Sequence, residues 1–498
     1  MATYSRVTSS AMMRAENAMA SGTAWSGLTS DSRLVKPGYL FAALSGAHTD
    51  GARFIADAVA RGATTVLGAA ALAPTVEALG VRFVADEQPR RRLAELAADF
   101  YRAQPEVIAA ITGTNGKTSV SVFLRQIWQR QGYKAASLGT IGLVSPFGVQ
   151  SLAHTTPDPV ELHGLLAELA GKGVQHLALE ASSHGLDQYR LDGVRLAAAA
   201  FTNITRDHLD YHPDFAHYLA AKCRLFRDLT PPSAPAVIFA DVPYAEIMRA
   251  EAQAQNLRII SIGSGDNNEI QICETQSGHW GQILRLKVMG RKLAVRLPLV
   301  GAFQAANALV AAGLAMGLGE NEEAVFAALA ELHGAPGRLE KVALAQNGAP
   351  IFVDYAHTPD ALENVLRAMR PHVAGRIIVV FGCGGDRDRG KRSVMGDVAN
   401  RLAEVVIVTD DNPRSEDPAR IRKEVREGCP AALEIGDRAE AIAAAITLLL
   451  PGDVLIIAGK GHETGQIVNG EIRPFSDHAV ACASARQAGG RAIAMAAP

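Results

Sequence analysis

The sequence predicts an α/β fold made of three consecutive domains, and its length, composition and patterning all point that way. At ~100–200 residues per domain, a chain of 498 residues suggests about three domains. Apolar residues make up 48% of the chain and charged residues 20%, which is enough for several packed cores. Short apolar runs alternate with segments of helical periodicity, the pattern of sheets covered by helices. The expected domains are residues 1–88, 89–335 and 336–498.

The first two domains are predicted from their apolar runs. In the small N-terminal domain, YLFAAL (39–44) and ATTVLG (63–68) are predicted strands, and GARFIADAVARG (51–62) is a predicted helix. The central domain begins with a helix at 90–103 and has candidate strands at 107–111, 175–179 and 196–202, which predict a parallel sheet. HGAPGRLE (333–340) interrupts the pattern with glycine and proline and is expected to be a linker.

The last domain is predicted to be Rossmann-like. It has four clear strands, at 351–354, 377–381, 405–409 and 454–458, and each is followed by helix-forming sequence. This alternation predicts a mostly parallel, doubly wound sheet. Ligands of such sheets lie beyond the carboxyl ends of the strands, so functional side chains are expected directly after each strand.

Composition excludes several classes of function. The net charge of −2 gives no argument for binding to nucleic acid or to a membrane surface. The five cysteines form no C-x-x-C pair, so neither a zinc site nor a disulfide framework is expected, which fits a reducing cytoplasm. The N-terminal segment carries Glu16 and polar residues where a signal peptide needs an apolar core. No run approaches the ~18 apolar residues of a membrane span, so a cytoplasmic protein is expected.

The stretch VIAAITGTNGKTSV (107–120) combines a predicted strand, a glycine loop and a predicted helix. The strict P-loop pattern needs glycine at the position of Ile111, so that pattern fails. The remaining loop still directs backbone N–H groups at the helix start toward an anion. Lys117 would add a positive charge, and Thr118 could bind Mg²⁺. The alternative is an ordinary strand-to-helix turn with an unrelated lysine.

Metal-binding side chains follow the next two strands of the central domain. Glu180 ends one strand, and NITRDHLDYH after the other contains Asp207, His208 and Asp210. Oxygen ligands suit Mg²⁺, which also uses phosphate oxygens and water. The alternatives are a capping or solvated carboxylate at Glu180 and a hydrogen-bonded loop histidine at position 208.

Lys222 lies on an apolar helical stripe in PDFAHYLAAKCRLFRDL, where Asp214 is the predicted N-cap. One interpretation is a lysine whose stem lies along apolar surface while its ammonium reaches water. The other is a desolvated amine of lowered pKa, able to react with CO₂ and become a carbamate anion. The sequence alone leaves both open.

In the last domain, charged side chains follow adjacent strands. Arg387 lies in GCGGDRDRGK, Arg414 in DDNPRSEDP, and Glu463 in GKGHETGQ. Two arginines and a glutamate suit a small zwitterion, because Arg grips carboxylates and Glu pairs with ammonium. A dinucleotide site is a weaker interpretation, because Arg387 occupies the third glycine of G-x-G-x-x-G. Surface ion pairs at the sheet edge are the remaining alternative.

Taken in order, these motifs resemble a known family over nearly the whole chain. The motifs are TGTNGKTS, TTPD (155–158), EASSHGLDQYR, NITRDHLDYH, AAK (220–222), GRLE, DYAHTPD, GCGGDRD and DDNPR. The set closely resembles the Mur ligases, ATP-dependent amide-forming enzymes of peptidoglycan synthesis. The loop of that family is G-T-N-G-K-T/S without the leading glycine, which favours phosphate binding here.

The resemblance implies a role for each matching residue. ATP would be bound by Gly113, Thr114, Asn115, Gly116, Lys117, Thr118, Ser119, Asn307, Arg338, Asp354 and His357. Mg²⁺ would be bound by Thr118, Glu180 and His208, and Lys222 would be the carbamylated lysine. The UDP-muramoyl-dipeptide would contact Ser32, Arg33, Thr155, Thr156, Ser182, Gln188 and Arg190, with His48 as a candidate. The incoming amino acid would contact Arg387, Asp411, Asn412, Arg414, Gly459 and Glu463. Lys117, Lys222 and His208 would be catalytic.

The implied reaction adds meso-2,6-diaminopimelate to UDP-N-acetylmuramoyl-L-alanyl-D-glutamate through an acyl phosphate. ATP and Mg²⁺ are the expected cofactors, and a monomer without nucleic acid or stable membrane association is expected. Two departures stand out: Gln304 replaces an asparagine in GAFQAAN, and the loop SGAHTDG around His48 varies among relatives.

Other functions are weaker interpretations. L-lysine could be the amino acid added, but Arg414 favours a substrate with a second carboxylate. A folylpolyglutamate synthetase is disfavoured by the N-terminal domain with its DSR motif and by DDNPR. A GTP switch lacks its N-K-x-D motif, and an oxidoreductase is disfavoured by Arg387.

Overall fold

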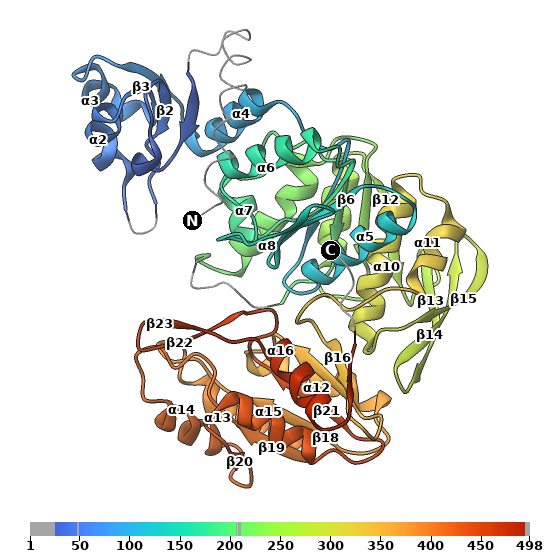
Figure 1. The fold of residues 1–498 in the computed structure, drawn as a ribbon. Helices are drawn as coiled ribbons and strands as arrows, with labels where there is room; N and C mark the ends of the chain where they lie inside the picture. Colours follow the sequence, from blue (N-terminus) through green and yellow to red (C-terminus); the bar gives the residue numbers. More distant parts are fainter. Residues whose placement is uncertain (1–24, 47–48, 206, 208–210, 494–498) are drawn as a thin grey trace.

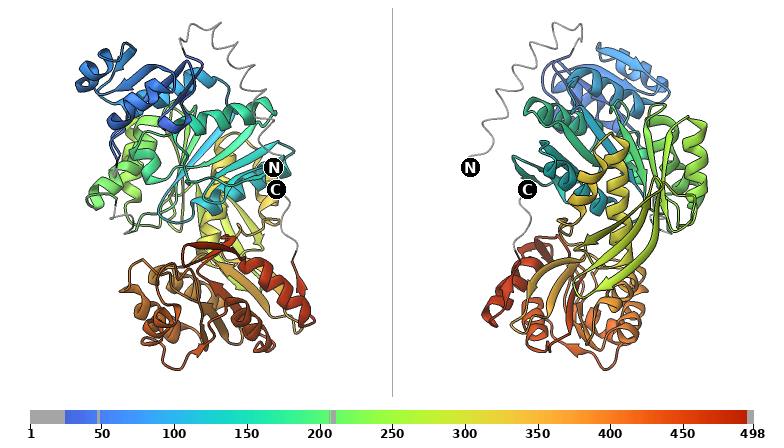
Figure 2. Two further views of the ribbon diagram at one scale, coloured as in Figure 1. Left: turned by 60° about the vertical axis from the view of Figure 1, so that its left-hand side comes forward. Right: turned by 90° about the vertical axis from the view of Figure 1, so that its right-hand side faces the viewer.

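The computed structural model describes residues 25–46, 49–205, 207 and 211–493. Three parallel or mixed sheets, each covered by helices, succeed one another along the chain (Figure 1). Figure 2 shows the N-terminal and C-terminal parts at opposite ends of the molecule, with the central part between them. The α/β class and the three-part organisation agree with the sequence-based prediction.

The N-terminal sheet has four parallel strands in the order β1-β2-β3-β4. The strands are β1 Gly27–Thr29, β2 Tyr39–Ala42, β3 Ala63–Gly68 and β4 Arg82–Ala85, and the helices are η1 Ser32–Leu34, η2 Gly51–Phe54, α2 Ile55–Ala60, η3 Ala70–Leu72, α3 Ala73–Glu77 and α4 Pro89–Tyr101. The predicted helix at 51–62 begins as a 3-10 turn capped by Asp50. Helix α4 buries Leu93 and Leu96 against this sheet and also packs against α6 of the central part, so it connects the two.

The central sheet has eleven strands in the order β15-β14-β13-β12-β11-β10-β5-β9-β6-β7-β8. Its strands are β5 Val107–Thr112, β6 Ala135–Gly139, β7 Gly142–Ser145, β8 Gly148–Gln150, β9 His176–Glu180, β10 Ala198–Phe201, β11 Pro235–Phe239, β12 Arg258–Gly263, β13 Ile270–Gly278, β14 Gly281–Val288 and β15 Arg291–Leu297. Its helices are α5 Lys117–Arg130, α6 Pro159–Gly171, α7 Ser183–Asp187, α8 Phe215–Arg224, η4 Leu225–Leu229, α9 Ala245–Ala254, α10 Ala302–Gly317 and α11 Glu322–Leu329.

The central sheet is parallel only in its middle. The three predicted strands correspond to β5, β9 and β10. β5 lies between β9 and β10 and pairs with both in parallel. Antiparallel strands extend both edges, as β6-β7-β8 and β13-β14-β15. The expectation of a parallel sheet is therefore corrected to a mixed sheet. The middle strands carry apolar residues on both faces because helices cover both faces, and each face has its own core.

The C-terminal sheet has the order β20-β19-β18-β21-β17-β16-β24, with antiparallel pairing only at β16 and β24. Its strands are β16 Glu340–Leu344, β17 Pro350–Asp354, β18 Ile377–Phe381, β19 Val405–Val408, β20 Leu433–Glu434, β21 Val454–Ala458 and β24 Arg491–Ala492, and a separate hairpin pairs β22 Gly465–Val468 with β23 Glu471–Pro474. The helices are α12 Pro359–Met369, η5 Arg370–His372, α13 Lys391–Leu402, α14 Pro418–Arg426, α15 Arg438–Thr447 and α16 Asp477–Gln487. The doubly wound prediction is confirmed for this part.

Two contacts join the central and C-terminal parts beside α10. Gln304, on the first turn of α10, donates from Nε2 to the carbonyl oxygen of Arg338 over 2.9 Å. His372 accepts a hydrogen bond from the N–H of Gly301 and donates to the carbonyl of Gly278. In the described ranges, no helix is long and apolar enough to cross a membrane.

Candidate active site

The glycine loop connects β5 to α5, as the sequence predicted. Gly116 is the N-cap of α5, with φ +89°, and a Cβ there would lie 2.4 Å from Oδ1 of Asn307. Gly113 has φ +151°, and a Cβ there would lie 2.0 Å from Oγ1 of Thr202. Both positions therefore require glycine. The ammonium of Lys117 turns back onto the loop and donates to the carbonyls of Gly113 (2.8 Å) and Thr114 (2.9 Å).

Glu180 lies beside this loop at the end of β9 and is buried. Its Oε2 accepts hydrogen bonds from the hydroxyls of Thr118 and Thr140, each over 3.1 Å, and its Oε1 accepts one from the N–H of Thr140. Thr118 and Glu180 thus bring two oxygen donors together, as a Mg²⁺ site requires. His208 and Asp210 lie outside the described residues. Among the residues described, no group of three or more His, Cys, Asp or Glu side chains could hold a metal.

Lys222 is buried beneath the same loop, with only 1% of its surface exposed. Asp214 caps its helix, α8, as predicted. The Nζ atom donates to the carbonyl of Gly113 over 2.8 Å and lies 4.5 Å from the centre of the Tyr218 ring. Burial and the nearby charge of Lys117 hold the pKa of the Lys222 amine well below its usual range. The interpretation of an ammonium that reaches water is wrong, because the amine lies inside the protein.

The residues expected on the nucleotide side gather where α10 meets the C-terminal part. Asn307 donates to Oε1 of Gln304 over 3.3 Å, so the glutamine that departs from the family pattern is part of this cluster. The guanidinium of Arg338 lies 4.8 Å from the ring centre of Tyr355, and its Nε is buried without a hydrogen-bond partner among the described residues. That orphaned donor fits an anionic ligand such as a nucleotide.

Asp354 is the last residue of β17 and His357 follows it, at the same edge. The carboxylate of Asp354 accepts hydrogen bonds from the N–H groups of Leu339 (2.6 Å) and Ala356 (2.7 Å). Burial raises the pKa of Asp354 to about 6, against the lowering effect of the Arg338 charge and these N–H donors. Nδ1 of His357 is hydrogen-bonded to the Tyr355 carbonyl, and its other ring nitrogen has no hydrogen-bond partner among the described residues. Because Leu339 is the neighbour of Arg338, the hydrogen bond from Leu339 to Asp354 holds the linker that carries Arg338.

The residues expected to hold the muramoyl-dipeptide form one hydrogen-bonded cluster next to Glu180. Thr156 donates to the Glu180 carbonyl (2.8 Å) and accepts from Ser182, and Arg190 donates to the Thr156 carbonyl (2.6 Å) and to Gln188 (2.8 Å). The hydroxyl of Thr155 lies 3.1 Å from that of Thr140. This cluster connects the expected dipeptide site to the phosphate loop.

The expected uridine contacts are separate from that cluster. Ser32 is buried in η1, and Arg33 is exposed and pairs with Asp31 over 2.6 Å. No hydrogen bond within the described ranges joins Ser32 or Arg33 to the central part. His48 lies outside the described residues. A substrate long enough to contact both ends would have to span the N-terminal and central sheets.

The expected amino-acid site lies at the carboxyl edge of the C-terminal sheet. Asn412 and Arg414 follow β19, and Glu463 follows β21. Nη1 of Arg414 donates to the carbonyls of Gly385 (2.8 Å) and Asn412 (3.4 Å), and the amide of Asn412 donates to Glu463 over 3.0 Å. A Cβ on Gly459, whose φ is +118°, would lie 2.7 Å from Oδ2 of Asp411, so these two residues touch. Arg387 is exposed on the neighbouring loop after β18.

Two residues that contact predicted site residues were not themselves predicted as site residues, one in the amino-acid site and one beside Glu180. Lys460 is fully buried and pairs with Glu463 over 3.0 Å. Thr140 holds both oxygens of Glu180. Lys460 belongs to the strand-end motif GKGHETGQ. Its burial could not be predicted, because it depends on contacts with the DDNPR loop, which is distant in sequence. Thr140 follows a strand that the apolar pattern did not predict.

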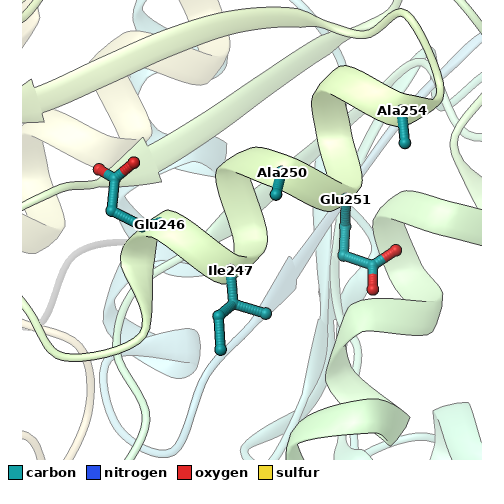
Figure 3. Close-up of a pocket in the computed structure, with 5 residues that line it drawn as sticks. All are labelled: Glu246, Ile247, Ala250, Glu251 and Ala254. Atoms are coloured by element: carbon teal, nitrogen blue, oxygen red, sulfur yellow. The ribbon is translucent and has the colours of Figure 1, made fainter.

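A surface pocket elsewhere does not belong to this site. It is lined by Glu246, Ile247, Ala250, Glu251 and Ala254, all on α9. Figure 3 shows these side chains spread along that single helix, with the two carboxylates apart from each other. None of them is a predicted site residue.

A glycine loop at the parallel middle of a mixed sheet, with charged strand ends on a second sheet, is the arrangement of a multidomain α/β enzyme that binds a nucleotide. Three family models match the chain: Mur ligase family, catalytic domain (residues 25–101), Mur ligase middle domain (111–315) and Mur ligase, glutamate ligase domain (337–461). The chain belongs to the Mur ligase family.

Individual relatives agree with this assignment. The UDP-N-acetylmuramoyl-L-alanyl-D-glutamate–2,6-diaminopimelate ligase of Bradyrhizobium diazoefficiens is 55% identical over 92% of this chain and 94% of its own. A solved structure of a ligase of that name has TM-score 0.71 at 34% identity, covering 93% of this chain and 95% of that one. A folylpolyglutamate synthase of Mycobacterium tuberculosis, solved with ADP and AMPPCP, has TM-score 0.60 at 20% identity over 74% of this chain and 92% of its own, and shares the fold alone.

Proposed function

We propose that this protein is the ATP-dependent ligase that joins meso-2,6-diaminopimelate to UDP-N-acetylmuramoyl-L-alanyl-D-glutamate in the cytoplasm. The observation that supports the choice of diaminopimelate is that the guanidinium of Arg414 has no carboxylate partner among the described residues. Its bonded partners are the carbonyls of Gly385 and Asn412, and no carboxylate of the described residues lies within 4.0 Å. The nearest candidate on its own loop, Glu416, pairs with Arg389 and Arg392 instead. Arg414 is therefore available for a carboxylate of the substrate.

The two amino acids differ at that point. Diaminopimelate carries a carboxylate at the far end of its side chain, and lysine does not. An arginine left without an anion in a closed site costs several kcal/mol, so lysine would bind poorly. The relatives named for diaminopimelate support the same choice.

ATP would bind with its phosphates on the glycine loop and its nucleoside near Asn307, Arg338, Asp354 and His357. Lys117 would leave the carbonyls of Gly113 and Thr114 and turn to the phosphates. Thr118, Glu180 and His208 would hold Mg²⁺, which would neutralise charge on the transferring phosphoryl group. The hydroxyl of Thr118 and the carboxylate of Glu180 already lie 3.1 Å apart, which fits this role.

The reaction would proceed in two steps. An oxygen of the D-glutamate γ-carboxylate attacks the γ-phosphorus of ATP, the bond to the β-phosphate oxygen breaks, and ADP leaves. The amine of diaminopimelate then attacks the carbonyl carbon of the acyl phosphate, the carbon–oxygen bond to phosphate breaks, and the amide forms with loss of a proton. Thr156, Ser182 and Arg190, clustered beside Glu180, would orient the dipeptide for the first step.

Lys222 is proposed to act as a carbamate. Only a neutral amine reacts with CO₂, and the lowered pKa of Lys222 favours the neutral form. Carbamylation would replace the second of two cations at the Gly113 carbonyl with an anion. That anion would offset the charge of Lys117 and could order the metal site.

The three expected domains, 1–88, 89–335 and 336–498, would each bring one substrate. The phosphate loop and the amino-acid site lie on different sheets, so closure of the C-terminal domain would be needed to align the reacting groups and exclude water.

The test is a coupled assay of ADP release by the purified protein. Release that requires both UDP-N-acetylmuramoyl-L-alanyl-D-glutamate and meso-diaminopimelate is expected. Release driven equally well by L-lysine would overturn the choice of amino acid, and release driven by a folate and glutamate would overturn the choice of reaction.

A further inference from the structure

The buried ammonium of Lys460 links the residues expected to bind the incoming amino acid. Its Nζ donates to Oδ1 of Asn412 over 3.1 Å and to Oε2 of Glu463 over 3.0 Å. The amide of Asn412 donates to the same Oε2 over 3.0 Å. Lysine, asparagine and glutamate thus form a closed triangle between the loop after β19 and the loop after β21.

The backbone around Lys460 is shaped to bury it. Gly459 and Gly461 flank it with φ of +118° and +54°, and a Cβ on Gly461 would lie 2.8 Å from Cβ of Tyr355. Residues with an L side chain rarely adopt such positive φ values, so glycine is favoured at both positions. The side chain of Lys460 between them points inward and is not exposed at all. A fully buried cation at this position needs a specific partner, and Glu463 supplies it.

The triangle also contacts the hairpin of β22 and β23, which lies beside the expected amino-acid site. Oδ1 of Asn412 accepts a second hydrogen bond from the N–H of Ile467 in β22, over 2.9 Å. The N–H of Arg414 donates to the carbonyl of Ile467 over 3.0 Å. In Figure 1 this hairpin, β22 and β23, lies on the side of the C-terminal part that faces the central part. The Oδ1 atom of Asn412 and one of its two amide N–H groups are therefore engaged within the protein, which leaves Glu463 as the member with an acceptor oxygen for a ligand ammonium.

Glu463 has one oxygen to spare. Its Oε2 carries both hydrogen bonds of the triangle, while its Oε1 accepts none from the residues that the structure describes. The side chain is 33% exposed, in contrast to the 0% of Lys460. The carboxylate is thus anchored through one oxygen and open through the other.

We propose that Lys460 is a positioning residue of the amino-acid site, which fixes Glu463 so that Oε1 receives the ammonium at the far end of diaminopimelate. This inference rests on the proposed function. Arg414 bonds only to backbone carbonyls among the described residues, so it stays available for the far carboxylate of diaminopimelate. The ammonium and the carboxylate at that end would then each have a partner of opposite charge.

The experiment compares two substrates in Lys460→Met. One is meso-diaminopimelate, and the other is 2-aminopimelate, which keeps both carboxylates and the attacking amine but lacks the far ammonium. The wild type should prefer diaminopimelate. In Lys460→Met the KM for diaminopimelate should rise about tenfold or more, as expected for a lost charged hydrogen bond, while kcat and the KM values for ATP and 2-aminopimelate change little.

A double-mutant cycle separates positioning from general stability. Adding Lys460→Met to Glu463→Gln should cause little further loss of preference, because both changes remove the same interaction. Lys341→Met, a half-buried lysine on β16 outside the site, is the matched control and should keep the wild-type preference. Should Lys460→Met fail to fold, Lys460→Gln keeps a donor while losing the charge, and a loss of preference is expected there as well.

The outcomes distinguish this inference from the proposed function. A wild type with no diaminopimelate-dependent ADP release contradicts the proposed function. A wild type that ligates diaminopimelate, with a Lys460 variant that keeps full preference over 2-aminopimelate, contradicts this inference alone. Equal losses for both substrates would also overturn it, because they would mark Lys460 as a residue that only maintains the fold.

Discussion

Lys117 and Lys222 donate hydrogen bonds to the same atom, the carbonyl oxygen of Gly113, each over 2.8 Å. One lysine begins α5 and the other lies near the end of α8, so two helices bring their amines to one acceptor. Two ammonium groups at one buried carbonyl repel each other, and burial lowers the pKa of both. This contact favours loss of the proton from Lys222, which the proposed carbamate requires.

The first prediction concerns Lys222. Lys222→Ala should lower kcat by about 100-fold or more, because an anion that orders the phosphoryl-transfer site is lost. Added short carboxylic acids should restore part of the activity by taking the place of the carbamate. Rescue is measured as ADP release against acid concentration. Lys222→Arg with full activity would contradict the carbamate, since arginine cannot form one.

The second prediction concerns Lys117. Lys117→Ala should lower kcat by about 100-fold or more, because the cation that meets the phosphates is removed. The fold should survive, because among the residues that the structure describes the ammonium of Lys117 bonds only to the loop carbonyls of Gly113 and Thr114. Circular dichroism and urea unfolding check the fold, and single-turnover kinetics check the rate. A well-folded variant with near-normal turnover would refute the phosphate loop.

The third prediction concerns the choice of amino acid. Arg414→Ala should reduce kcat/KM for meso-diaminopimelate by at least ~30-fold, the equivalent of about 2 kcal/mol for a truncated charge pair. The KM for ATP should not change. Arg401→Ala, an exposed arginine on α13 paired with Asp397, is the matched control. Retention of the diaminopimelate preference in Arg414→Ala would show that this loop does not select the substrate.

The fourth prediction concerns stability and pH at the linker. Burial raises the pKa of Glu340 from 4.5 to about 7, against the lowering effect of the Gly337 N–H that it accepts. Between these pH values the folded protein keeps a proton that the unfolded chain has lost, so this contribution to stability falls as pH rises. Above pH ~7 the cost is about 3 kcal/mol, at ~1.36 kcal/mol per pKa unit.

Glu340→Gln should remove that dependence. The free energy of unfolding of the variant minus that of the wild type should grow by about 3 kcal/mol from pH ~4.5 to above pH ~7, because the glutamine does not ionise. Urea unfolding of both proteins across this range measures the difference, in which titrating groups distant from Glu340 cancel. His478, whose Nε2 lies 3.8 Å from Oε1 of Glu340, does not cancel, so the same pair is compared in a His478→Gln background. A difference that is flat with pH would contradict the assignment to Glu340.

Buried parallel strands were the part of the fold best predicted from sequence. The predicted bounds of β3, β18 and β21 match the structure. β18 and β21 are continuous apolar runs, and β3, ATTVLG, follows one glycine and ends at another. The hairpins β13 to β15 were missed. β14, GQILRLKV, alternates between buried and less buried residues, and most of β13 is exposed, so neither strand is a continuous apolar run.

The sequence predicted which residues of the site follow strands. It did not predict the hydrogen bonds between these residues. Asn412, Arg414 and Glu463 were found from their positions after strands, whereas the burial of Lys460 depends on pairing across two loops. The burial of Lys222 likewise could not be decided from its apolar stripe, because a stem along the surface gives the same spacing. Packing of α8 beneath Gly113 excludes that alternative.

Transfer of a labelled oxygen tests the central claim most directly. The substrate is UDP-N-acetylmuramoyl-L-alanyl-D-glutamate with oxygen-18 in the γ-carboxylate, incubated with ATP, Mg²⁺ and meso-diaminopimelate. An acyl phosphate passes one carboxylate oxygen to phosphate, so the inorganic phosphate released should carry one labelled oxygen for each amide formed. Unlabelled phosphate, with ADP still released, would contradict activation of the γ-carboxylate by phosphoryl transfer.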